Sequence, residues 1–96
     1  MRVKEFLKQR RENIIQIASK HGAYNIRVFG SVARGEEGAA SDIDLLVDIG
    51  ERISPWFPAG FITDLEKLLG YKVEVVTKRG LDPHIRENVL EEAILL

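Results

Sequence analysis

The segment Ile43–Ile49 limits the possible folds more than any other part of the sequence, because its apolar residues alternate with other residues. Ile43, Leu45, Val47 and Ile49 would lie on one face of a β-strand, since successive side chains of a strand point to opposite faces. An apolar sheet face has to be covered by other elements of the chain. The sequence therefore predicts a sheet that is packed against helices.

Two further segments are expected to be strands. Residues Tyr24–Phe29 form a short run of β-forming residues, and residues Tyr71–Thr77 are rich in valine. The first run breaks at Gly30-Ser31, after which a short helical turn through Val32–Arg34 is expected. Residues 35–41 are small or acidic and are expected to form a loop.

Three segments have the spacing of amphipathic helices. Apolar residues recur at helical intervals from Val3 to about Ser19, and His21-Gly22 supplies a stop signal. The same periodicity returns in residues 61–69, and Pro83 suits the first turn of a last helix that ends near residue 92. Residues 50–58 contain two prolines and are expected to be irregular.

The order of helices and strands predicts an α/β fold, in which a small mixed sheet is flanked by helices. Residues 1–96 are expected to form one domain with a modest core. No apolar run approaches the roughly 20 residues that cross a bilayer, and the first residues lack the apolar block of a signal peptide. Because cysteine is also absent, we expect a cytoplasmic protein that does not bind membranes.

The charges exclude some kinds of partner and site. Fourteen basic and fifteen acidic residues nearly cancel, which argues against nucleic acid as the main partner but leaves a nucleotide ligand open. With no cysteine and two histidines, any metal is expected to be a hard cation held by carboxylates.

Gly30-Ser31 is a candidate phosphate site at the end of a strand. Glycine lets the backbone approach a ligand closely, the following amides can point at an anion, and the Ser31 hydroxyl adds a donor. A plain connection between two elements would have the same sequence. Arg34, at the end of the expected turn, suits a phosphate contact or a position on the surface.

Three acidic residues are candidate metal ligands. Asp42 and Asp44 share one face at the start of a strand, about 6–7 Å apart at the backbone, so their carboxylates can converge on a hard cation. They can also be solvated residues at a strand entry. Glu74 lies in the middle of a valine-rich strand, where a buried carboxylate needs a partner. On an edge strand facing solvent it would need none.

The sequence from Gly30 to Gly35, followed by a loop and by Asp42-Ile43-Asp44-Leu45, resembles the signature of the DNA polymerase β-type nucleotidyltransferases. More specifically, the whole chain is similar in length and element order to the minimal nucleotidyltransferases (MNT proteins). The resemblance implies that Gly30 and Ser31 hold a nucleoside triphosphate such as ATP. It implies that Asp42 and Asp44 ligate Mg²⁺ and that Glu74 stands at the third carboxylate position, where aspartate is more common.

The same resemblance implies a reaction and a partner. Such a chain would transfer a nucleotide, AMP by preference, to a hydroxyl group, with Asp42, Asp44 and Glu74 as the catalytic residues. MNT proteins often act as antitoxins beside HEPN-domain toxins, so the acceptor would be a tyrosine of the toxin. One alternative is a binding module that neutralises its partner by covering it, with little or no catalysis. Another is a homo-oligomer that modifies a small molecule such as an antibiotic.

Five other features of the sequence are interpreted without a catalytic role. His21 is expected to favour the end of the first helix through the helix dipole, and His84 to be exposed. Asp48 shares the face of Asp44 but is expected to lie away from the site. Trp56-Phe57 can cap the core or form part of a docking patch, and the apolar tail, residues 93–96, can add an edge strand, complete the core or seat a partner.

Overall fold

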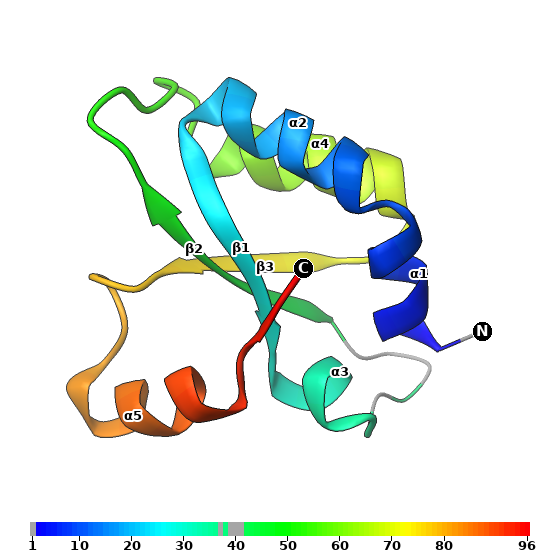
Figure 1. The fold of residues 1–96 in the computed structure, drawn as a ribbon. Coiled ribbons are helices and arrows are strands. Elements are labelled where there is room, and N and C mark those ends of the chain that lie inside the picture. Colours follow the sequence, from blue (N-terminus) through cyan, green and yellow to red (C-terminus); the bar gives the residue numbers. More distant parts are fainter. Residues whose placement is uncertain (1, 37, 39–41) are drawn as a thin grey trace.

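A computed structural model describes residues 2–36, 38 and 42–96, which form a four-stranded sheet with helices on both faces (Figure 1). The strands are β1 (Ala23–Phe29), β2 (Ile43–Ile49), β3 (Val73–Thr77) and β4 (Ile94–Leu95). The helices are α1 (Val3–Gln9), α2 (Arg11–His21), α3 (Gly30–Arg34), α4 (Ala59–Leu69) and α5 (Pro83–Glu92).

The sheet is mixed, as the sequence predicts. Its strand order is β3-β2-β1-β4, in which β1 is antiparallel to both of its neighbours and β2 is parallel to β3. The parallel pair requires a crossover, which α4 provides between β2 and β3. The α/β fold with a small mixed sheet flanked by helices is therefore confirmed.

One face of the sheet carries the main core. The helices α1, α2 and α4 lie over this face in Figure 1, and their apolar side chains meet the alternating residues of β2. Leu45 and Val47 of β2 and Phe61 of α4 are fully buried in this cluster. The alternation in Ile43–Ile49 thus marks the face against which the helices fold.

The opposite face is covered only in part. Its centre is Leu46 of β2, which is fully buried and packs with Leu81 and with Val89 of α5 in a second, smaller apolar cluster. Asp44 and Asp48 flank Leu46 on the same face, because side chains of a strand alternate. The helix α5 therefore separates two polar regions, one at each end of β2.

The first helical segment is divided into two helices, so the expectation of one continuous helix is wrong. The break lies at Arg10, whose φ of −99° and ψ of 10° are not helical, and whose N–H donates to the carbonyl oxygens of both Phe6 and Leu7. No apolar residue occurs between Leu7 and Ile14, so no core contact holds this stretch straight. The Arg10 guanidinium instead lies over the ring of Phe6, 5.1 Å from its centre.

The ends of the other elements differ in detail from the sequence prediction. The third strand begins at Val73 rather than at Tyr71, and the first begins at Ala23. Two of the three alternatives for the tail are confirmed. The tail forms the edge strand β4, whose pairing with β1 is extended by a hydrogen bond from Leu96 N–H to the Ile26 carbonyl. It also completes the core, because the Leu96 side chain is buried in the main apolar cluster. In residues 2–36, 38 and 42–96, no helix is both long enough and apolar enough to span a bilayer.

Candidate active site

The register of the two parallel strands brings Asp44 and Glu74 together. Asp44 of β2 is paired directly with Glu74 of β3, so the two side chains leave the sheet on the same face. Their carboxyl groups lie close enough for a hydrogen bond between them to raise the pKa of Asp44. Glu74 is exposed and stands on the edge strand β3, so of the two alternatives for this residue the structure adopts the one in which it faces solvent. Asp44 is more deeply buried than Glu74.

Ionisation of both Asp44 and Glu74 at the same time is unfavourable. The pKa of Asp44 is raised from 3.8 to about 6, first by burial and then by the hydrogen bond and charge of Glu74. Two neighbouring carboxylates cannot both ionise without cost unless a cation is present. Two carboxyl groups this close together therefore suit a ligand that carries positive charge.

Asp42 lies just before β2 and is exposed. Its charge acts on Asp44 and contributes to the raised pKa of that carboxyl group. Among the described residues, no three acidic, histidine or cysteine side chains are grouped closely enough to hold a metal ion. The structure thus brings Asp44 and Glu74 into contact, with Asp42 close by at the strand entry.

Gly30 joins the end of β1 to α3 beside this pair. Phe29 is paired with Asp44 in the antiparallel register, which places the next residue next to the Asp44 carboxylate. Gly30 has a φ of +73°, and a Cβ atom at this position would collide with Oδ2 of Asp44. Both the backbone conformation and the contact therefore require glycine.

Ser31 and Arg34 complete the group of predicted nucleotide-binding residues. Ser31 is half-buried, and its hydroxyl makes no hydrogen bond with any part of the chain that the structure describes. Arg34 is exposed and ends α3. It lies near enough to Asp44 for its charge to favour the ionised carboxylate.

Glu92, the last residue of α5, belongs to the same region. Its Oε1 accepts a hydrogen bond of 2.8 Å from Gly30 N–H, and both of its oxygens accept from Nη1 of Arg34, at 3.2 and 3.0 Å. Sequence reasoning missed this residue. Glu92 is 62 positions from Gly30, and nothing in the local pattern of the last helix indicates the contact.

The other residues singled out in the sequence lie elsewhere. His21 ends α2, as expected, but it is buried and bonded through Nε2 to Asp64, 2.9 Å away. His84 is exposed, as predicted. Asp48 is bound by Arg27 and by Asn25 at the far end of β2, which agrees with its expected distance from the site.

The two aromatic residues of the proline-containing loop have different positions. Phe57 is half-buried and stacks on the Phe61 ring of the core, with 5.8 Å between the ring centres. Trp56 is 73% exposed. Phe57 therefore caps the core, and Trp56 is left on the surface.

Of the expected loop 35–41, residues 37 and 39–41 lie outside the described part of the chain.

The arrangement provides two kinds of binding group in one place. Carboxylate oxygens of Asp44 and Glu74 are ligands that suit a divalent cation. Beside them, the Ser31 hydroxyl and the Arg34 guanidinium can donate hydrogen bonds to phosphate oxygens. A chain with these groups can hold a metal–phosphate complex against the end of the sheet.

Sequence comparisons agree with this chemistry. The model of the nucleotidyltransferase domain family matches residues 1–96. The protein adenylyltransferase MntA of Thermococcus cleftensis is 38% identical over 79 residues, which cover 82% of this chain and 80% of MntA. A Methanocaldococcus jannaschii protein, named as a candidate protein adenylyltransferase, is 38% identical over 84 residues, which cover 88% of this chain and 90% of that protein.

Solved structures share the fold. A structure described as a candidate minimal nucleotidyltransferase is 49% identical, with a TM-score of 0.84, and the match covers 96% of this chain and 94% of that one. A toxin–antitoxin crystal structure with AMP-PNP has a TM-score of 0.72 at 21% identity and shares the fold, over 88% of this chain and 69% of that one. The chain therefore belongs to the nucleotidyltransferase family and is one of its minimal members.

Proposed function

We propose that this chain transfers AMP from ATP to a hydroxyl group of a partner protein, in a reaction that requires Mg²⁺. The observation that carries the proposal is the contact between Asp44 and Glu74 beside Gly30 and Ser31. Residues 1–96 would act as one domain, and Asp42, Asp44 and Glu74 would hold the metal. When bound, Mg²⁺ would neutralise charge on the phosphates and on the attacking oxygen.

The residues of the chain would have separate tasks. Gly30, Ser31 and Arg34 would bind the triphosphate and orient it, because positioning and charge neutralisation dominate phosphoryl transfer. The hydroxyl oxygen of the acceptor would bond to the α-phosphorus while the bond between the α-phosphorus and the bridging oxygen breaks. Pyrophosphate would leave with that oxygen, and Glu74 would take the proton of the hydroxyl group.

The identity of the acceptor is inferred from relatives. MntA is named a protein adenylyltransferase, and the solved toxin–antitoxin structures with the same fold pair such a chain with a toxin. We therefore propose that this chain is an antitoxin. The resemblance of its Gly30–Gly35 and Asp42–Leu45 segments to the MNT proteins adds the proposal that the acceptor is a tyrosine of a HEPN-domain toxin, in the cytoplasm where ATP and Mg²⁺ are present.

A second candidate function is supported by the position of Glu92. Its carboxylate already uses Gly30 N–H and Arg34, two of the groups that would bind phosphate. A chain whose phosphate site stays closed in this way would act as an antitoxin by covering its partner. The exposed Trp56 would suit such a contact.

Glu92→Gln is expected to raise the affinity of the free chain for ATP by about tenfold, since an exposed or half-exposed charged hydrogen bond contributes roughly 1–2 kcal/mol. The neutral amide keeps the size of the side chain but competes less well with a phosphate for Arg34. Titration calorimetry with ATP and Mg²⁺ measures the change. Glu91→Gln, which alters the exposed neighbouring residue, is the matched control, and equal affinities for both variants would contradict a competing role of Glu92.

The test of the proposed function is labelling with radioactive ATP. The chain, the protein encoded beside it and Mg²⁺ are incubated with ATP labelled either in the α-phosphate or in the γ-phosphate. Label on the partner from α-labelled ATP alone supports adenylyl transfer. Neutralisation of the partner without any label, which persists in an Asp42→Ala/Asp44→Ala variant, would establish the binding module instead.

A further inference from the structure

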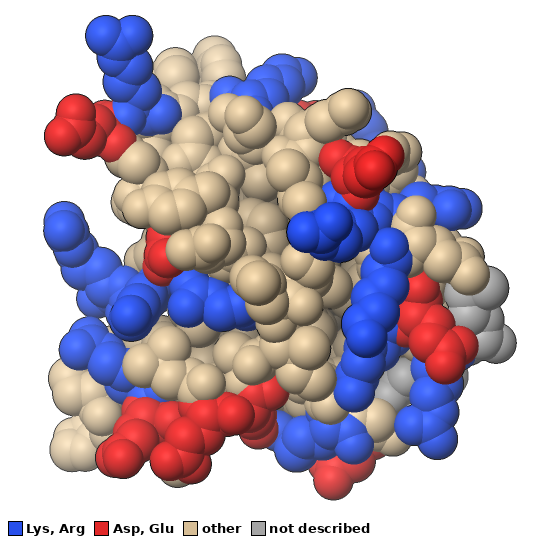
Figure 2. Space-filling model, viewed as in Figure 1, with Lys and Arg blue, Asp and Glu red and all other residues tan. Residues whose placement is uncertain are grey.

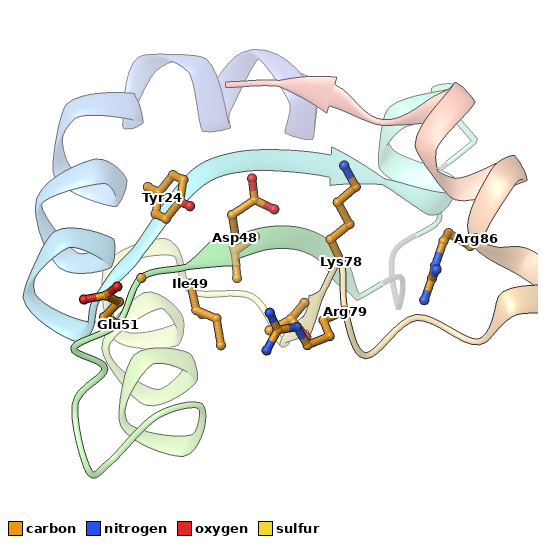
Figure 3. Close-up of a pocket in the computed structure, with 10 residues that line it drawn as sticks. Tyr24, Asp48, Ile49, Glu51, Lys78, Arg79 and Arg86 are labelled. Carbon is orange, nitrogen blue, oxygen red and sulfur yellow. The ribbon is translucent and has the colours of Figure 1, made fainter.

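The far end of β2 borders a cavity of about 670 Å³ that the proposed function does not use. It lies between the carboxyl ends of β2 and β3 and the helix α5 (Figure 3). Sites for small molecules commonly enclose roughly 300–1,000 Å³, so this cavity has the size of a ligand site. We call it the cationic cavity, because Lys78, Arg79 and Arg86 line it.

The cationic cavity is distinct from the candidate active site. Asp48, in its wall, is four residues from Asp44 along the same strand, which corresponds to about 13 Å. Leu46 lies between these two residues on the same face, fully buried beneath α5. A ligand in the cavity is therefore separated from the Asp44–Glu74 pair by the apolar contact between the sheet and α5.

One end of the cavity has unused positive charge. Lys78 and Arg79 follow β3 directly, and neither forms an ion pair in the part of the chain that the structure describes. Arg86 is half-buried and is fixed by a hydrogen bond of 3.3 Å from Nη2 to the Leu81 carbonyl, while its Nε finds no acceptor. Its guanidinium is thus held in place with donors to spare.

The acidic residue in the middle of the wall does not cancel this charge. Asp48 accepts hydrogen bonds from Arg27 Nη2, at 2.8 Å, and from Asn25 Nδ2, at 3.0 Å. Arg27 pairs directly with Asp48, and the charge of Lys78 also acts on Asp48. With Arg27 included, four cations face the two acids Asp48 and Glu51, so the wall keeps an excess of positive charge. Figure 2 shows Lys and Arg side chains gathered along the left border of the molecule, between the sheet and α5.

The other end of the cavity offers a ring and a carboxylate. Figure 3 shows Tyr24 and Glu51 on the side away from Arg86, with Lys78 and Arg79 between. The Tyr24 side chain is 52% exposed, so its ring is available for stacking. The Glu51 carboxylate is exposed and can accept hydrogen bonds from hydroxyl or amino groups.

We propose that the cationic cavity is a second ligand site, which binds a phosphorylated small molecule with a planar ring, of the nucleoside monophosphate class. The phosphate contacts Lys78, Arg79 and Arg86, and the ring packs on Tyr24. A phosphate monoester suits three cations better than a carboxylate does, because it carries a charge of about −1.5 to −2 near neutral pH. Arginine also matches the oxygens of a phosphate with two parallel donors.

Nuclear magnetic resonance of the ¹⁵N-labelled chain tests this site, with AMP as the probe and EDTA present to suppress metal-dependent binding. We expect saturable shifts of the amide signals of Tyr24, Lys78, Arg79 and Arg86, and none at Gly30. Adenosine and inorganic phosphate should each bind at least about tenfold more weakly than AMP, because each fills only one end of the cavity.

The variant Lys78→Ala/Arg79→Ala should weaken AMP binding at least about tenfold, as expected for the loss of two charge-assisted contacts. Both residues are exposed, so the fold should be retained. Its matched control, Arg11→Ala/Lys67→Ala, removes two exposed cations from α2 and α4 on the other face and should leave binding unchanged. Equal binding by both variants would overturn the proposal, as would shifts centred on Gly30 or saturation by an acidic peptide but not by AMP. None of these outcomes depends on metal or on nucleotide transfer.

Discussion

Asp44→Asn is expected to reduce nucleotide transfer about a thousand-fold, because a charged ligand of a catalytic metal contributes several kcal/mol to the transition state. Asparagine has nearly the same shape, so the packing around Gly30 and Glu74 is kept while the charge is lost. The rate of labelling of the partner protein from α-labelled ATP measures the effect. Unchanged labelling would show that Asp44 has no part in the reaction.

The same substitution is expected to stabilise the free chain at pH 8. Burial and the Glu74 carboxyl group raise the pKa of Asp44 to about 6. The folded chain therefore holds this proton more tightly than the unfolded chain does, and stability falls as the pH rises from about 4 through about 6. Asp44→Asn removes this loss, so its melting temperature in EDTA should exceed that of the natural chain at pH 8 and equal it near pH 3.5.

Asp48→Asn is the matched control and should act in the opposite direction. Hydrogen bonds from Asn25 and Arg27 lower the pKa of Asp48, so its ionised form stabilises the fold above about pH 4 and this contribution is lost as the pH falls. At pH 8 the Asp48→Asn variant should therefore melt at a lower temperature than the natural chain. Equal shifts of both variants in the same direction would contradict the electrostatic description of β2.

Gly30→Ala is expected to lower both transfer and stability. Alanine at a φ of +73° costs about 1–2 kcal/mol, and its Cβ would also displace the Asp44 carboxylate from its place beside Glu74. The displacement should reduce the rate of transfer at least about a hundred-fold, because small misplacements of reacting groups have effects of this size. Thermal melting and the labelling reaction measure the two effects.

Gly70→Ala is the control that separates the effect of backbone strain at a positive φ from the effect of the contact between Gly30 and Asp44. Gly70 has a φ of +75°, close to that of Gly30, but a Cβ atom there would meet nothing within 4 Å. Its alanine variant should therefore lose a similar strain energy, about 1–2 kcal/mol, and keep its rate of transfer. If both variants lost transfer equally, the role assigned to the Gly30–Asp44 contact would be wrong.

The sequence predicted those features that depend on local pattern. The alternation in Ile43–Ile49 identified β2 and its core face, and the period of residues 61–69 identified α4. The pairing of Asp44 with Glu74 could be expected from the resemblance to a family, but its register depends on the crossover through α4. The gap in apolar residues between Leu7 and Ile14 is visible in the sequence, but the helical spacing on either side of it gives no sign that the helix breaks at Arg10.

Contacts between segments that are far apart in the chain could not be predicted from the sequence. Glu92 reaches Gly30 and Arg34 only because β4 pairs with β1 and holds the end of α5 beside α3. The cationic cavity likewise combines Tyr24 of β1, Lys78 after β3 and Arg86 of α5. Tyr24, Lys78 and Arg86 belong to no sequence motif. They come together in space only because of the order of the strands in the sheet.

We propose above all that Asp42, Asp44 and Glu74 hold a metal–nucleotide complex beside Gly30 and Ser31. Nuclear magnetic resonance with Mn²⁺ tests it most directly, because this ion broadens the signals of nearby nuclei. In the presence of a non-hydrolysable ATP analogue, the amide signals of Gly30, Ser31, Asp44 and Glu74 should broaden first, and Asp44→Asn should abolish the effect. Broadening that begins elsewhere, or that persists unchanged in Asp44→Asn, would contradict the claim.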